Sequence, residues 1–387
     1  MDVTLVLLEI SVMIFVAEAL RTSLSKVSVP SLIGEILAGL LLSPYALGGL
    51  IDSATGVKIF TLNNYLLFIS EFSMILLIFS SGLEHGISPI KNSGVHGILG
   101  ATLGAILPFL AAFLAFSNSV GTDSALILGS AVGATSMAAA ASIIESGKLK
   151  GRGIDLLMSM ASTDDVVDLV LLSIILGTLA GQSSPLAIAK ATVFYIVAWA
   201  VIFLVSIKVI PIVANRLGDV YIEEFSMLII FGLTALMTSL NFSPVISSFI
   251  AGVALAESVK KERVHQLVTV LLSVFGSIFF VTVGAQVDVA AINMNQLLLA
   301  LEITAIAVAF KILGVLPFAY LALRNLKASI STSLGMVPRG ETGLVVGSIG
   351  LSVGALNSAE FSAVVLMALF STVIGGLLFR WTSKWLE

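Results

Sequence analysis

The sequence predicts an all-α integral membrane protein with 13 transmembrane helices, arranged as two repeats of opposite orientation. Composition is the first reason, since 58% of the 387 residues are hydrophobic and only 11% are charged, which is typical of a chain surrounded by lipid. Thirteen apolar segments, each close to the length of about 20 residues that a spanning helix needs, are the second reason. The third is a short motif that occurs twice, seven segments apart.

The 13 segments are separated by short polar stretches. Segments 2 and 9 are the shortest, and each begins at a proline, Pro30 or Pro244, which suits the first turn of a helix. In chain order the segments cover residues 3–20, 28–44, 62–82, 94–116, 122–144, 153–181, 187–211, 222–240, 243–257, 266–286, 296–322, 328–353 and 359–380.

Basic residues in the connections predict the orientation of the chain, because cytoplasmic loops carry an excess of Lys and Arg. Only Lys58 and Lys190 follow even-numbered segments. Those that follow odd-numbered segments are Arg21, Lys26, Lys91, Lys148, Lys150, Arg152, Lys208, Arg216, Lys260, Lys261, Arg263, Arg324, Lys327, Arg380 and Lys384. We therefore expect a multi-pass protein of the cell membrane with its amino terminus outside and its carboxyl terminus in the cytoplasm.

The composition also excludes several classes of site and partner. Because the chain contains no Cys, it can form neither disulfides nor thiolate metal sites. A net charge of -4 argues against a nucleic-acid partner. We expect no resident cofactor, and membrane lipid as the surroundings.

The repeated motif lies in segments 2 and 9. It reads Pro-Ser-Leu-Ile-Gly-Glu-Ile-Leu-Ala-Gly over residues 30–39 and Pro-Val-Ile-Ser-Ser-Phe-Ile-Ala-Gly over residues 244–252. Gly82 near the end of segment 3 is likewise matched by Gly284 in segment 10. Equivalent positions are seven helices apart, and an odd shift gives the two halves opposite orientations, as in many secondary transporters.

The repeat makes segments 5 and 12 counterparts, and both contain residues that resist regular helix. These residues are Gly133, Ala134, Thr135 and Ser136 in segment 5, and Pro338, Arg339, Gly340 and Glu341 in segment 12. Since unwound backbone at membrane depth is tolerated only inside protein or beside a cavity, we expect two broken helices that cross. Arg339 and Glu341 fit either a direct role in transport or an ion pair that only closes the break.

Charged residues inside the apolar segments mark the candidate site. Asp164 and Asp165 are adjacent in the middle of segment 6, and Lys311 lies near the middle of segment 11. An ionisable group at the bilayer centre costs at least roughly 2.5 to 3.5 kcal/mol, so such groups usually pair or line an ion path. Lys311 therefore predicts a counter-ion, for which either aspartate is suitable. A purely structural role for the two aspartates is the alternative.

Together these residues resemble the monovalent cation:proton antiporters of the second cation:proton antiporter family, and the resemblance covers essentially the whole chain. The similar stretches are residues 30–39, Glu71 with residues 76–79 and 82–84, the Asp164–Asp165 pair, Phe279 and Phe280 with Gly284, Lys311, and residues 336–341. The resemblance implies the fold of sodium/proton antiporters. It also implies that Asp165 binds the cation and the proton, that Asp164 pairs with Lys311, and that Glu71 supports the site.

The resemblance further implies a homodimer with fixed and moving parts. Dimer-scaffold helices 1–3 would occupy residues 1–92 and helices 8–10 residues 216–290. Core helices 4–6 would occupy residues 93–183 and helices 11–13 residues 291–387, with linker helix 7 at residues 184–215.

These residues predict a transporter and not an enzyme. A carboxylate in a low dielectric binds either a proton or a hard cation, so competition for one site enforces exchange. Oxygen ligands from Asp165, Asp164, Thr135 and Ser136 suit Na⁺ or Li⁺. The family resemblance implies that an Asp-Asp pair with Lys311 belongs to an electrogenic sodium exchanger. A K⁺/H⁺ antiporter or the membrane domain of a potassium-efflux system is the alternative. An intramembrane aspartyl protease fits poorly, because it takes its two carboxylates from different helices, and a channel needs no titratable site.

Overall fold

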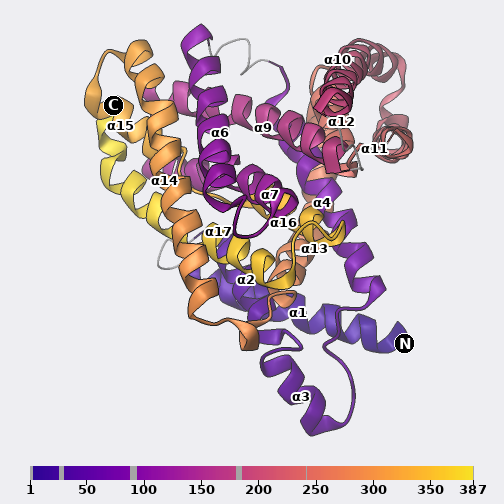
Figure 1. The fold of residues 1–387 in the computed structure, drawn as a ribbon. Coiled ribbons are helices and arrows are strands. Elements are labelled where there is room, and N and C mark those ends of the chain that lie inside the picture. Colours follow the sequence, from indigo (N-terminus) through magenta and orange to yellow (C-terminus); the bar gives the residue numbers. More distant parts are fainter. Residues whose placement is uncertain (1–2, 26–29, 88–93, 180–184, 241, 387) are drawn as a thin grey trace. The chain divides into compact units, whose positions relative to one another are not determined.

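The computed structural model describes residues 3–25, 30–87, 94–179, 185–240 and 242–386, and the regular structure in these ranges is helical throughout (Figure 1). Lys26 and Lys91, two of the basic residues used to predict the orientation, lie outside the described residues. The helices are α1 Val3–Ser25, α2 Ser31–Leu42, α3 Leu47–Thr55, α4 Asn64–His85, α6 Gly94–Phe116, α7 Thr122–Gly133, α8 Met137–Gly147, α9 Arg152–Leu179, α10 Pro185–Arg216, α11 Ile222–Ser239, α12 Pro244–Ala256, α13 Lys261–Ala285, α14 Met294–Leu323, α15 Leu326–Gly335, α16 Glu341–Ser352 and α17 Ser358–Thr382.

Each predicted segment coincides with one helix or with a broken pair of helices. Ten helical stretches of the described chain are long and apolar enough to cross a membrane, which confirms an integral membrane protein. Helices α9 and α12 are not among these ten. Helix α9 carries three aspartates within its apolar part, and α12 has only 13 residues. Segment 12 is divided into α15 and α16, of 10 and 12 residues. Helix length and composition therefore do not establish the count of 13.

Helix α3 was not predicted. It follows α2 after a turn in which the Ala46 and Gly49 amides both donate to the Ser43 carbonyl oxygen. It ends at Gly56, whose φ of 70° is readily adopted by a residue without a side chain. With nine residues and exposed Leu47 and Leu50, it is too short to cross the bilayer.

The chain divides into two compact units. The first contains residues 1–71, 93–165 and 277–387. Its core joins α6, α8, α9, α14, α15 and α17, and the side chains of Leu157, Met160 and Phe379 are fully buried in it. The polar segments between α7 and α8 and between α15 and α16 lie in this unit.

The second unit contains residues 72–92 and 166–276. Its core is formed by apolar residues of α4, α10, α11, α12 and α13, with Phe79, Ile230 and Leu255 fully buried. Gly82 of α4 and Gly252 of α12 meet in this core, since a Cβ on either would overlap a backbone carbonyl oxygen of the other helix. The backbones of α4 and α12 are therefore in contact.

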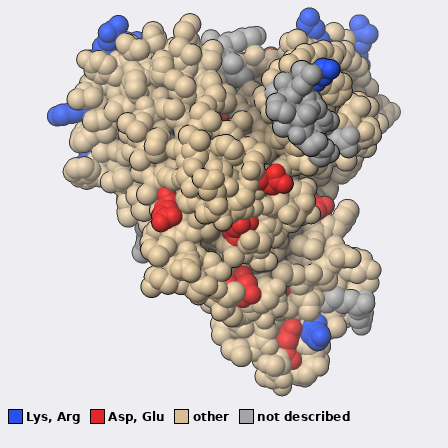
Figure 2. Space-filling view, in the orientation of Figure 1, with Lys and Arg blue, Asp and Glu red and all other residues tan. Residues whose placement is uncertain are grey.

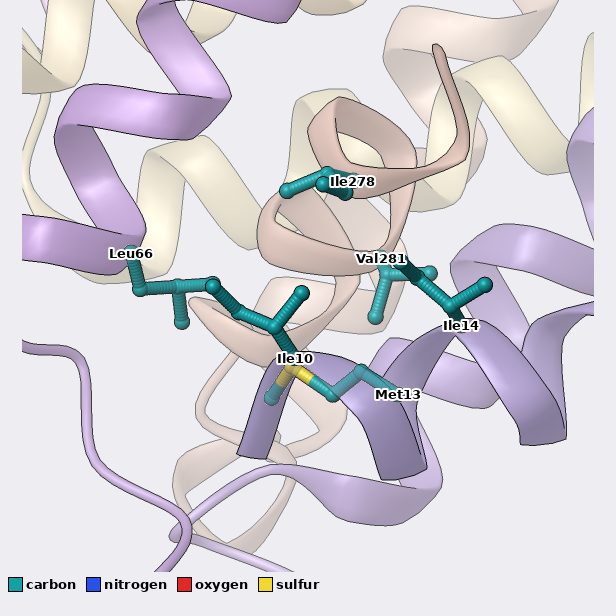
Figure 3. A pocket seen from close by; sticks show the side chains of 6 residues that line it. All are labelled: Ile10, Met13, Ile14, Leu66, Ile278 and Val281. Atoms are coloured by element: carbon teal, nitrogen blue, oxygen red, sulfur yellow. The ribbon is translucent and has the colours of Figure 1, made fainter. Parts of the chain in front are cut away.

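A similar contact joins α2 and α13 in the first unit. A Cβ on Gly39 would overlap the Val281 carbonyl oxygen, and a Cβ on Gly284 would overlap that of Ile36. Next to it, apolar side chains of α1, α4 and α13 line a small pocket (Figure 3), namely Ile10, Met13, Ile14, Leu66, Ile278 and Val281.

Most of the surface seen in Figure 2 carries neither Lys or Arg nor Asp or Glu, as expected for contact with lipid.

Candidate functional site

The first break in a membrane helix separates α7 from α8. Helix α7 ends at Gly133, the chain is extended at Ala134, and α8 begins at Met137. Ser136 caps α8, because its hydroxyl accepts from the Ala139 amide at 3.5 Å, as Ser commonly does at a helix start. Segment 5 is thus two half-helices joined by an extended linker, as predicted.

The second break separates α15 from α16. Helix α15 ends at Gly335 and α16 begins at Glu341, and residues 337–340 between them have no regular structure. Pro338 cannot donate a backbone hydrogen bond, so it cannot continue α15. Segment 12 is therefore broken at the predicted place.

The two breaks bind each other. The Ser136 amide donates to the Pro338 carbonyl oxygen at 2.8 Å, and the Thr135 hydroxyl donates to that of Met336 at 3.1 Å. The Ser136 hydroxyl also donates to the Glu341 carboxylate at 2.9 Å. Backbone groups that neither half-helix can satisfy are thus satisfied between the linkers, as buried polar backbone requires.

Arg339 occupies the centre of this crossing and is fully buried. Its Nη1 donates to the Gly133 carbonyl oxygen at 2.8 Å and to that of Ala134, while Nη2 donates to the Ala307 carbonyl oxygen of α14 at 3.1 Å. The carbonyl end of a helix carries partial negative charge. The guanidinium therefore compensates the carboxyl end of α7 and ties it to α14.

Lys311 of α14 reaches the same end of α7. Its Nζ lies 2.7 and 2.8 Å from the two carboxylate oxygens of Asp164 and 2.9 Å from the Gly133 carbonyl oxygen. The Lys311 and Asp164 side chains are both fully buried. Lys311 is therefore paired with Asp164, the partner that the family resemblance implied.

Asp165 has different surroundings. Its side chain is 6% exposed, compared with 0% for Asp164. Oδ1 lies 3.5 Å from the hydroxyl of Thr342, in the first turn of α16. The amino end of a helix carries partial positive charge, so this position favours a carboxylate or another group of negative charge.

The family model for sodium/hydrogen exchangers, transmembrane, matches residues 11–385. The chain belongs to this family of exchangers. It is therefore a membrane antiporter, which is a kind of transporter.

Individual members of known activity are similar over nearly their full length. A Na⁺/H⁺ antiporter of Enterococcus hirae is 28% identical over 96% of this chain and 97% of its own. A Na⁺/H⁺-K⁺ antiporter of Bacillus cereus is 27% identical, with 91% and 90% covered. The solved structure of the sodium proton antiporter MjNhaP1 from Methanocaldococcus jannaschii has a TM-score of 0.75 at 16% identity, covering 100% of this chain and 98% of that one. The exchanger thus shares the helical antiporter fold.

One predicted site residue lies apart from this cluster. Glu71 is exposed on α4, as is Glu84 further along the same helix. Among the contacts described for the chain, none joins Glu71 to the crossing. Glu71 is the last residue of the first unit.

One residue of the site, Thr342 beside Asp165, was not predicted from the sequence. A threonine in an apolar helix is unremarkable in sequence, and the available signal was its position two residues after Gly340 at a helix start. In the described part of the chain, no group of three or more His, Cys, Asp or Glu residues could hold a metal ion.

Proposed function

We propose that this exchanger moves Na⁺ or Li⁺ against H⁺ across the prokaryotic cell membrane, and that the two ions compete for Asp165. One observation carries the assignment to Asp165. Both oxygens of Asp164 are hydrogen-bonded by the Lys311 ammonium, whereas Asp165 keeps some exposure and lies beside Thr342 in the first turn of α16. Asp164 is therefore already neutralised by Lys311, and we assign the transported ion to Asp165.

Competition at one carboxylate accounts for exchange. In a low dielectric an isolated carboxylate is unfavourable, so Asp165 changes sides carrying either a proton or a cation. Hydroxyl groups of Thr135 and Ser136 are suitable additional ligands for Na⁺, because an oxygen that donates its proton keeps lone pairs. We propose that the negative charge of Asp164 attracts the cation, and that one of its oxygens binds the cation when Lys311 moves away.

We further propose that exchange is electrogenic. The buried Lys311–Asp164 pair supplies a second proton-binding system beside Asp165, so two protons can be exchanged for one Na⁺, and one net positive charge then crosses the membrane in each cycle. K⁺/H⁺ exchange is the alternative, since a Na⁺/H⁺-K⁺ antiporter of Bacillus cereus and a K⁺/H⁺ antiporter subunit of Bacillus subtilis are both similar to this chain.

The architecture that we propose has 13 crossings in two inverted repeats. The two glycine contacts support it: Gly39 with Gly284 and Gly252 with Gly82 occupy equivalent positions in the two repeats, each in its own unit. The two broken segments are equivalent as well. We propose that helices 4–6 and 11–13 of this scheme move as a core against scaffold helices 1–3 and 8–10.

Orientation and assembly are proposed on the same basis. The excess of basic residues after odd-numbered segments supports an external amino terminus and a cytoplasmic carboxyl terminus. The family resemblance supports a homodimer. Cysteine labelling of single-Cys variants at Lys58 and Lys327 with a membrane-impermeant maleimide tests the orientation, since only position 58 should react from outside.

Transport in proteoliposomes tests the function. With an imposed proton gradient, addition of Na⁺ or Li⁺ should dissipate the gradient, and K⁺ should be ineffective. Clamping the potential with valinomycin and K⁺ should accelerate the Na⁺ response if exchange is electrogenic. A response to K⁺ alone would replace the proposal by K⁺/H⁺ exchange, and no response to any of the three ions would reject it.

A further inference from the structure

Helix α2 contains a buried carboxylate that the exchange scheme does not use. Glu35 is 6% exposed and lies within the candidate membrane span Ser31–Thr55. It follows Ser31, the first residue of α2, by about 6 Å along the helix axis. The carboxylate is thus buried about one turn inside an apolar span, where an ionisable side chain is costly and is usually functional.

Only one side chain binds Glu35. The Ser277 hydroxyl of α13 donates to Oε1 at 3.0 Å, and among the residues that the structure describes Glu35 has no other hydrogen-bond partner and no ion pair. Arg21, a cation of the neighbouring helix α1, forms its ion pair with Glu18 at 2.7 Å. The second carboxylate oxygen, Oε2, therefore still needs a proton or a cation.

The position of Glu35 is fixed by close helix packing. The backbone contact at Gly39 and Gly284 holds α2 against α13 on one side of Glu35 and Ser277. Beyond it, the Ser43 hydroxyl donates to the Ala285 carbonyl oxygen at 2.9 Å. Glu35 and Ser277 are thus held together by the fold on helices that cannot separate without breaking these contacts.

The turn of α2 that precedes Glu35 packs against the crossing of the broken helices. Leu32, one turn earlier on α2, packs against the second break, since a Cβ on Gly340 would lie 3.2 Å from Leu32 Cδ2. The same added Cβ would overlap the Ser136 hydroxyl. Helix α2 therefore lines the crossing with the turn that precedes Glu35.

We propose that Glu35 and Ser277 form a second station for the transported ion, where a proton or Na⁺ is held by Glu35 Oε2 with the Ser277 hydroxyl oxygen as neighbour. This inference rests on the proposed function, because the station serves the same exchange. Na⁺ arriving at a protonated Glu35 displaces the proton, and the reverse step reloads it. The station raises the local concentration of ions near Asp165, and Asp165 remains the site of exchange.

Kinetics of Glu35→Gln test the station. The amide keeps the shape of the side chain and can still accept from Ser277, but it binds neither a proton nor a cation. We expect the KM for Na⁺ to rise by about fivefold with kcat nearly unchanged, as when binding alone is lost. Glu262→Gln removes an exposed carboxylate from the first turn of α13 and serves as the matched control, with kinetics of the wild type.

Infrared difference spectra provide a readout that a structural role would not change. Adding Na⁺ to the purified wild-type protein should deprotonate Glu35, and the lost carboxylic C=O band should be absent from the Glu35→Gln spectrum. The band should persist in Asp165→Asn, where exchange is abolished. If Glu35→Gln cannot be purified, Ser277→Ala should shift the band of Glu35 and raise the KM to a smaller extent.

The outcomes separate this inference from the proposed function. A wild-type KM in Glu35→Gln, or a Glu35 band that does not respond to Na⁺, would overturn the station while wild-type Na⁺/H⁺ exchange stands. Failure of the wild-type protein to exchange Na⁺ for H⁺ would instead overturn the proposed function.

Discussion

Lys311 Nζ lies within hydrogen-bond distance of both carboxylate oxygens of Asp164, and both side chains are completely buried. The third bond of the ammonium goes to the Gly133 carbonyl oxygen at the end of α7. One side chain of α14 thus holds α9 and the first broken helix together. Breaking such a pair by removing one partner leaves an uncompensated charge in a low dielectric, which costs more than the pair itself contributes.

We therefore predict that Lys311→Gln strongly lowers thermal stability. The loss should correspond to roughly 3 to 5 kcal/mol, the cost of an orphaned buried charge, and is measured as the melting temperature of the detergent-purified protein. Lys327→Gln removes an exposed lysine and should melt with the wild type.

The double variant Lys311→Gln/Asp164→Asn should recover part of that stability, because no charge is then left unpaired. A double variant that melts below Lys311→Gln would show that the carboxylate is stabilised by groups other than Lys311.

For transport, we predict that Asp165→Asn abolishes Na⁺-driven proton flux while the protein still inserts and purifies. The amide has nearly the same shape but cannot bind a proton reversibly or carry a full negative charge. Flux in proteoliposomes is measured beside Asp155→Asn, which removes an exposed carboxylate from the first turn of the same helix. Exchange at the wild-type rate in Asp165→Asn would remove this residue from the mechanism.

The sequence predicted the helices and breaks well, because apolar length, Pro and Gly act locally. Apolar patterning predicted a partner for Lys311 without choosing between Asp164 and Asp165, and the choice of Asp164 came from the family resemblance. Adjacent residues point about 100° apart on a helix, so the choice depends on how α9 is rotated in the packed unit.

Contacts with backbone atoms could not be predicted from the sequence for another reason. The carbonyl oxygens of Gly133 and Ala307 bind Arg339, yet each residue carries a carbonyl, and nothing in the side chains marks these two. Thr342 became visible as a neighbour of Asp165 only once α16 was placed. The family resemblance predicted that Glu71 supports the site. Its exposed position on α4 depends on how the helices pack, which the sequence alone does not give.

Arg339 should not be replaceable by lysine. Its planar guanidinium donates to α7 and α14 at once, whereas an ammonium is a compact donor on a different stem. We predict that Arg339→Lys loses at least one bond to a carbonyl oxygen, and that each such charge-assisted bond contributes about 1.5 to 3 kcal/mol. Melting temperature is compared with Arg380→Lys, an exposed position that should be neutral. Equal melting of both variants would contradict the central role of Arg339 at the crossing.

The glycine contacts lead to a prediction that depends on packing alone. A Cβ on Gly39 would overlap backbone of α13, and one on Gly252 would overlap backbone of α4, whereas a Cβ on Gly232 of α11 meets nothing within 4 Å. Backbone cannot move aside as a flexible side chain can, and overpacking costs typically about 1 to 3 kcal/mol. We expect Gly39→Ala and Gly252→Ala to lower the melting temperature by similar amounts, because they occupy equivalent positions in the proposed repeats. Gly232→Ala should be neutral or should gain up to about 1 kcal/mol from helix propensity. If one of the two substitutions is tolerated as well as Gly232→Ala, the helices at that contact are further apart than the structure has them, and the equivalence of the two contacts fails with it.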